Sequence, residues 1–201
     1  MKKLIVITQE KIIPQEASII TNIIEAGADR VHIRKPLTPL KDIELLLQSL
    51  PPQYHKQIVL HDAHTLASHY NVGGLHLNHR HPSPPDWWSG DVSRSCHTLH
   101  EIERYKKTCN YLFLSPIHNS ISKQGYTSQY TPQELLQAHQ RGIIDHNVIA
   151  LGGITIDNIN SVLTYGFGGI AMLGYVWNNH NTKEITHIIK QIKSQLSCYN
   201  L

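Results

Sequence analysis

Short apolar runs alternate with amphipathic stretches along most of the chain. Runs rich in Val, Ile and Leu are typical of strands that are buried on both faces of a parallel sheet. They predict strands over residues 3–8, 30–34, 57–60, 74–77, 91–95, 110–114, 147–151 and 168–173. The stretches between them predict helices over residues 14–26, 63–70, 155–166 and 182–196, with further helices beginning at Thr38, Thr98 and Thr131. Strands that alternate with helices predict an α/β fold.

The number of predicted strands favours one architecture. Eight strands with intervening helices predict a single-domain (β/α)8 TIM barrel over residues 1–201, with an open, doubly wound sheet as the alternative. The chain length of 201 residues lies at the lower end of the range for such barrels. No change of composition marks a linker. In a barrel the carboxyl ends of the strands meet at one rim, and active sites lie there.

Composition narrows the functional class. Hydrophobic residues make up 40% of the chain and charged residues 16%, which is typical of a globular protein. The net charge of +3 comes without a block of Lys and Arg, so we expect no nucleic-acid partner. No apolar run approaches the roughly 20 residues of a membrane span, so we expect no membrane partner. The three cysteines are irregularly spaced and form no CxxC motif, which indicates reduced thiols in the cytoplasm.

Glycines follow the last two predicted strands. Gly152 and Gly153 come after residues 147–151, and Gly174 comes after residues 168–173. Glycines let backbone N–H groups approach a ligand, and the loops after strands 7 and 8 of a barrel frequently hold a phosphate. These three glycines therefore predict a phosphate site, although a single glycine pair would more simply indicate a tight turn.

Polar residues at the other strand ends predict the remaining contacts to an anionic substrate. Arginine, lysine and hydroxyl groups are suitable donors for such a ligand. The alternative for each residue is an ordinary solvated side chain. The candidates are Arg34, Lys35, Asp62 and Ser95 at strand ends, and Ser120, Ser122 and Lys123 in the loop after residues 110–114.

Histidines are the candidates for proton transfer, because their ordinary pKa lies near neutral pH. The chain has 15 histidines, and five lie near predicted strand ends: His32, His61, His76, His97 and His118. His76 could instead point into the barrel. A further pair, His79 and His81, has no neighbouring acidic or cysteine ligand, so we expect no metal site.

Several short motifs occur in the order and spacing of one known family. They are residues 31–34 (VHIR), 60–63 (LHDA), 74–77 (GLHL), 94–98 (RSCHT) with Glu101, 115–117 (SPI) with Ser120, Ser122 and Lys123, and residues 148–154 and 166–174. Over nearly the whole chain this arrangement resembles the thiamin phosphate synthase/TenI family. The resemblance implies a barrel that binds a phosphorylated thiazole. It also implies one of two activities, Mg²⁺-dependent coupling of a pyrimidine diphosphate to thiazole phosphate or metal-independent tautomerisation of a thiazole carboxylate phosphate.

Departures from the synthase pattern favour the TenI-type thiazole tautomerase. Pro36 stands where the resemblance implies a pyrophosphate-binding Lys, and the second metal-binding Asp falls near His81, so that Asp62 alone remains. We therefore expect a tautomerase without a cofactor, with Mg²⁺ required only if the chain is a synthase. The family's proton-transfer His aligns with Pro116, so we take His118 as the proton-transfer residue, with His61 or His97 as alternates.

Two readings stay open beside the tautomerase. One is a thiamin phosphate synthase with a reduced metal site. The other is a non-catalytic protein that binds thiazole or thiamin phosphate and acts as a regulator. A homo-oligomer is compatible with each of these functions, and the sequence does not determine the oligomeric state.

Overall fold

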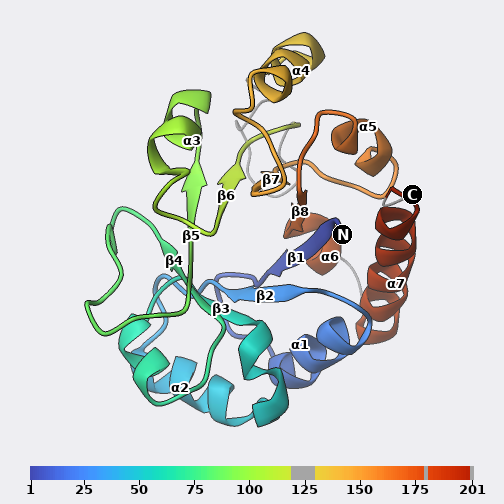
Figure 1. Cartoon of the computed structure of the whole chain (residues 1–201). Coiled ribbons are helices and arrows are strands. Elements are labelled where there is room, and N and C mark those ends of the chain that lie inside the picture. The colour runs from blue at the N-terminus through green and yellow to red at the C-terminus, as the bar shows by residue number, and fades with distance from the viewer. Residues whose placement is uncertain (119–129, 179–180, 200–201) are drawn as a thin grey trace.

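The chain folds into a closed barrel of eight parallel strands, each hydrogen-bonded to the next, with β8 pairing with β1 (Figure 1). The structure is a computed structural model, and it describes residues 1–118, 130–178 and 181–199. The strands are β1 (Lys3–Ile7), β2 (Arg30–Ile33), β3 (Ile58–Leu60), β4 (Gly74–Leu77), β5 (Asp91–Cys96), β6 (Tyr111–Leu114), β7 (Val148–Leu151) and β8 (Gly169–Met172). The predicted (β/α)8 barrel is confirmed, and the open sheet is excluded because the β1–β8 pairing closes the barrel.

Helices surround the strands in Figure 1. They are α1 (Glu16–Glu25), α2 (Leu40–Gln48), α3 (Leu99–Tyr105), α4 (Pro132–Gln140), α5 (Ile159–Leu163), α6 (Gly174–Trp177) and α7 (Thr182–Cys198), with 3₁₀ turns η1 (Pro52–Gln57) and η2 (His64–Ser68). Within the described part of the chain, no helix has the length and apolar character needed to cross a membrane.

Helix starts follow the capping chemistry of the sequence in two of the predicted cases. Thr98 and Thr131 each form a capping box with Glu101 and Glu134 respectively, which fixes the beginnings of α3 and α4. Thr155 does not cap a helix. Its backbone N–H is bound by the Asn158 side chain, so that α5 begins later and is shorter than the predicted helix.

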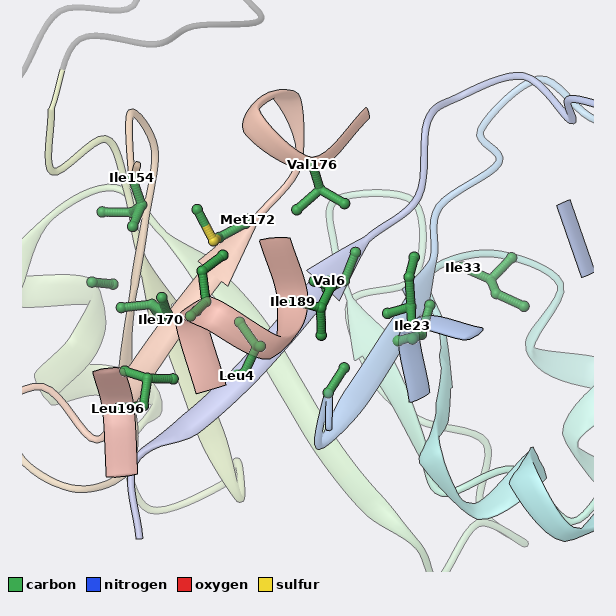
Figure 2. Close-up of a cluster of buried hydrophobic side chains, with 14 of the residues drawn as sticks. Leu4, Val6, Ile23, Ile33, Ile154, Ile170, Met172, Val176, Ile189 and Leu196 are labelled. Carbon is green, nitrogen blue, oxygen red and sulfur yellow. The ribbon is translucent and has the colours of Figure 1, made fainter. Parts of the chain in front are cut away.

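The main hydrophobic core lies between the barrel and its helices. The outward side chains Leu4 and Val6 of β1 pack with Ile189 of α7 and Ile23 of α1 (Figure 2). Strand side chains alternate between the two faces, so the same strands also present a second set of residues to the barrel interior. β1 (KLIVI), β7 (VIAL) and β8 (GIAM) are apolar on both faces and read as continuous hydrophobic runs, whereas β2 (RVHI) and β4 (GLHL) are interrupted by an inward histidine.

The barrel interior is divided into an apolar half and a polar half. A small apolar cluster fills it on one side and consists of Ile5, Ile7, Tyr111, Phe113, Ile149 and Ala171. Buried polar side chains fill the side formed by β2–β5 and their ends, namely His32, His61, His76 and Ser93. Hydroxyl and imidazole groups are rarely buried without partners. The hydrogen-bond partners of these buried groups are therefore described next, together with the candidate site that they adjoin.

Candidate active site

The carboxyl ends of the strands surround a cavity of about 390 Å³. Its lining residues are Ile7, Arg34, His61, His76, Asn78, His79, Arg80, Ser95, His97, Ser115, Pro116, Leu151, Gly152 and Leu173. Among these residues no side chain is acidic. A larger, open groove of about 830 Å³ lies against residues 11–18 and 37–49, outside the barrel mouth. We take the smaller cavity as the candidate site because it collects the strand ends.

Three histidines lie together at the floor of this cavity. His32 Nδ1 lies 2.8 Å from His61 Nε2, and the His61 and His76 rings are stacked with their centroids 3.9 Å apart. The register explains the contact, because Leu60 pairs with Leu75 and the following residues on both strands, His61 and His76, lie side by side. The three side chains form one buried imidazole cluster.

Hydroxyl groups bind the other nitrogens of the cluster. His32 Nε2 lies 2.6 Å from the Tyr111 hydroxyl, and the two His76 nitrogens each lie 2.9 Å from the hydroxyls of Ser93 and Ser95. A hydroxyl can donate or accept a hydrogen bond, so these partners are compatible with either imidazole tautomer.

Burial keeps the imidazole cluster uncharged. It is the main reason that the pKa of His76 is lowered to about 3 and that the pKa values of His32 and His61 lie well below the usual value. Nearby positive charge adds to the effect, with Arg94 acting on His76. Neutral imidazole can hydrogen-bond to a substrate or bind a metal, but it does not attract an anion by charge.

His97 is the histidine best placed for proton transfer at the cavity wall. Its Nδ1 lies 3.1 Å from the Ser115 carbonyl oxygen. A carbonyl oxygen only accepts hydrogen bonds, so Nδ1 carries the proton and Nε2 of the neutral ring is left as an acceptor. The Glu101 carboxylate holds the backbone N–H of His97 at 2.6 Å. These contacts orient a group that can take up a proton.

Arg80 enters the cavity through a turn that sequence reasoning did not single out. The Asn78 side-chain oxygen accepts the backbone N–H groups of Arg80 and His81, and its amide donates to the His61 carbonyl oxygen. The Arg80 guanidinium lies 2.6 Å from the Asp62 carboxylate. Asp62 is thus paired beside the cavity and is absent from its lining, while Arg80 lines it.

Arg34 and Lys35, both predicted to bind substrate, lie in different places. Arg34 lines the cavity, and its Nη1 also lies 2.6 Å from Glu10. Lys35 points away from the cavity and is fully buried, with its ammonium bonded to Glu16 and to the carbonyl oxygens of Gln9 and Lys11. The prediction that Lys35 binds substrate is therefore wrong. Consecutive residues at a strand end face opposite sides, so Lys35 points away from the cavity that Arg34 lines. Its three N–H donors are all used in the three hydrogen bonds just described.

Of the predicted glycines, Gly152 reaches the cavity. Its φ of +96° favours glycine, and a Cβ at this position would lie 2.9 Å from Pro116 Cα. Gly153 and Gly174 are not among the lining residues. The predicted phosphate site stays a prediction, with Gly152 as its contact to the cavity.

The predicted proton-transfer residue His118 lies in the loop after β6 and contacts the Gly152 loop, which follows β7. Its backbone N–H donates to the Gly152 carbonyl oxygen, and its Nε2 is buried without a hydrogen-bond partner among the described residues. Burial lowers its pKa. The His118 side chain does not line the cavity, so the geometry supports His97 better. Ser120, Ser122 and Lys123 lie outside the described residues.

Comparison with known proteins agrees with this architecture. The family model described as thiamine monophosphate synthase matches residues 4–176, which is most of the chain. This chain belongs to the thiamine monophosphate synthase family. The predicted resemblance is thereby confirmed at the level of the family, which supports an enzyme of thiamine biosynthesis that acts on phosphorylated small molecules. The match does not distinguish the TenI branch.

Relatives of this family member are named after the coupling reaction. The chain is 39% identical to the crystal structure of a thiamine phosphate pyrophosphorylase from Bacteroides thetaiotaomicron, covering 97% of this chain and 98% of that one with a TM-score of 0.88. It is 24% identical to a thiamine-phosphate synthase from Flavobacterium johnsoniae, covering 96% of each. A thiamine phosphate pyrophosphorylase from Pyrococcus furiosus, 20% identical with a TM-score of 0.76, covers 97% of this chain and 95% of that one and shares the fold. These names favour a transferase over the isomerase that the sequence led us to expect.

The residues of this family member do not fit the Mg²⁺ that the synthase reaction implies. Mg²⁺ is usually bound by one or two carboxylates together with substrate phosphates. Of the two metal-binding carboxylates that the resemblance to the synthases implies, Asp62 alone is present. Arg80 binds its Oδ1, and its Oδ2 is buried without a hydrogen-bond partner among the described residues. The described lining offers nitrogen and hydroxyl donors instead.

Proposed function

We propose that this chain binds thiazole phosphate in the 390 Å³ cavity and forms thiamine phosphate by coupling it to a pyrimidine diphosphate. The observation that carries the proposal is the 39% identity to a thiamine phosphate pyrophosphorylase over nearly the full length of both chains. The expected location in the cytoplasm and the possible homo-oligomer stay predictions.

The cavity offers suitable groups for such substrates. Arg34 and Arg80 supply guanidinium donors for phosphate, and Gly152 allows close approach of backbone. The neutral imidazoles and Ser95 can hydrogen-bond to an uncharged heterocycle without adding charge. In this proposal the arginines, rather than a resident metal, neutralise the leaving pyrophosphate.

A thiazole tautomerase is the second candidate, and a specific observation favours it. The described lining has no carboxylate for a metal, whereas His97 is oriented with its Nε2 available as a base. Proton transfer by one positioned histidine contributes typically about 10²–10⁴-fold to a rate. Such a reaction needs an anion site and a proton carrier, and the cavity provides candidates for both.

Two assays on the purified chain separate these functions. Coupling predicts release of pyrophosphate and formation of thiamine phosphate from the two substrates, tested with Mg²⁺ and with a chelator. Tautomerisation predicts conversion of the thiazole carboxylate phosphate to its aromatic isomer in the absence of the pyrimidine substrate. If thiazole phosphate raises the melting temperature but neither substrate turns over, the chain is a non-catalytic binder and both proposals fail.

A further inference from the structure

The imidazole cluster of His32, His61 and His76 has the composition of a transition-metal site. Each residue places one ring nitrogen so that the three lie within 4.8 Å of one another. All three side chains are buried, at 0%, 5% and 1% exposure respectively. His32 and His61 hold one another through Nδ1 and Nε2, and a metal ion bound between them would replace this one contact and add His76 as a third ligand.

From this arrangement we propose that His32, His61 and His76 bind a borderline divalent metal ion such as Zn²⁺ or Co²⁺ at the floor of the cavity. Three protein ligands with one open position are typical of catalytic rather than structural zinc sites. His61 and His76 line the cavity, so the open position faces the space where a substrate would bind. The proposal does not depend on which reaction the chain catalyses.

A second layer of hydrogen bonds supports the three ligands. In metal sites the nitrogen opposite the coordinating one is usually held by a hydrogen-bond partner, which fixes the tautomer and the orientation of the ring. His32 has the Tyr111 hydroxyl at its Nε2 while its Nδ1 faces His61. His76 has a serine hydroxyl at each nitrogen, so either nitrogen can coordinate while the other stays bonded.

The proton balance is also suitable. One proton lies in the hydrogen bond between His32 Nδ1 and His61 Nε2, where a metal would bind. If His32 Nδ1 carries that proton, it moves to His32 Nε2 when the metal binds; Nε2–H then donates to the Tyr111 oxygen, and the Tyr111 O–H turns to another acceptor. If His61 Nε2 carries it, the proton moves to His61 Nδ1. No proton needs to leave the buried site. The ligands are already neutral, as metal coordination requires.

Donor type decides which metals are suitable. Imidazole suits Zn²⁺, Co²⁺, Ni²⁺ and Cu²⁺, whereas Mg²⁺ prefers oxygen ligands. The imidazole cluster is therefore distinct from the Mg²⁺ chemistry discussed above. Arg30, Arg34 and Arg94 place positive charge near the three rings, which lowers the affinity for a dication until an anion occupies the cavity.

Titration with Co²⁺ tests the proposal directly, because tetrahedral Co²⁺ absorbs strongly in the visible range. We expect the metal-free protein, at neutral pH in phosphate-free buffer, to bind one equivalent of Co²⁺ with these bands and to retain one Zn²⁺ after dialysis. His61→Gln and His76→Gln should each weaken binding at least about 100-fold. His79→Gln removes a histidine that lines the same cavity outside the cluster, and should bind Co²⁺ like the parent protein.

A milder variant keeps the test decisive if the glutamine variants do not fold. Tyr111→Phe leaves all three ligands and should weaken Co²⁺ binding about tenfold by removing the partner of His32. NMR spectra of ¹⁵N-histidine-labelled parent protein should show Zn²⁺-dependent shifts of three imidazoles. Absence of saturable Co²⁺ binding by the folded parent protein, or equal binding by His79→Gln and a folded His76→Gln, overturns the proposal.

Discussion

Two neighbouring cationic residues that follow β2 point in opposite directions. Arg34 faces the cavity, whereas Lys35 is buried against Glu16 with its Nζ 2.6 Å from the carboxylate. Burial lowers the pKa of Lys35 despite this partner. Successive side chains of a strand point to opposite faces. Two adjacent cationic residues at a strand end therefore do not both reach the site, and their charge alone does not show which one does.

Removal of the Lys35 charge should strongly destabilise the fold. Lys35→Met leaves the Glu16 carboxylate buried without its partner, so we expect a loss of about 3–5 kcal/mol in the free energy of unfolding, measured with urea. Lys193→Met breaks the more exposed pair with Asp29 and should cost under about 1 kcal/mol. Similar losses in the two variants would contradict a structural role for buried Lys35.

Single substitutions also test which of His97 and His118 transfers the proton. His97→Asn should lower kcat of whichever reaction the assays detect by about 10²-fold, with a smaller change in KM, if this imidazole transfers the proton. The comparison variant is His118→Asn, measured under the same conditions. A larger loss in His118→Asn would return the assignment to the residue that the sequence first indicated.

At the scale of elements, α3 does more than cover the barrel. The N-cap of α3 is Thr98, and Glu101, the third helical residue of its capping box, binds the backbone N–H groups of both His97 and Thr98. Burial raises the pKa of Glu101, but these bonds outweigh it and keep the pKa below the usual value. The start of α3 therefore holds His97 at the cavity wall. On α4, the equivalent Glu134 caps a helix without contacting a lining residue.

This difference between two similar caps is testable. Glu101→Ala and Glu134→Ala should each cost about 1 kcal/mol in unfolding free energy, because each loses one side of a capping box. We expect Glu101→Ala alone to lower kcat as well, since His97 loses its anchor. Equal activities in the two variants, with equal stability losses, would mean that the cap has no role in the site.

At the scale of the whole molecule, the barrel interior links stability to pH. His32, His61 and His76 are buried and neutral, with folded pKa values below the ordinary histidine value of about 6.5. The unfolded chain binds more protons than the folded chain between the two values. Stability therefore falls as the pH drops below about 6.5, and for His76 it continues to fall toward pH 3.

The free energy of unfolding should show this effect in urea titrations. Each neutral buried histidine contributes a slope of up to about 1.4 kcal/mol per pH unit, so three contribute roughly 4 kcal/mol per unit near pH 5. His76→Phe should reduce the slope by about one third, whereas His79→Gln, which alters an exposed histidine, should leave it unchanged. A flat profile between pH 6 and 5 would contradict a neutral imidazole cluster.

The sequence by itself determined the barrel. Apolar runs gave the eight strands within a residue or two, and Thr98 and Thr131 marked two helix starts, because these features depend on neighbours along the chain. Local chemistry failed at Thr155, where the Asn158 side chain binds the backbone N–H first. Family motifs pointed to the family but gave a tautomerase, which the names of the relatives do not favour.

Only the tertiary structure decided which polar residues share a site. Closure of the barrel and the strand register bring His61 and His76 into contact, direct Arg34 inward and Lys35 outward, and place the Arg80 turn over Asp62. The alternation of inward and outward positions along β2 and β4 would have identified His32 and His76 as inward residues if the strand register had been known. These contacts join residues far apart in sequence, and their distances follow from closure of the barrel rather than from any local pattern.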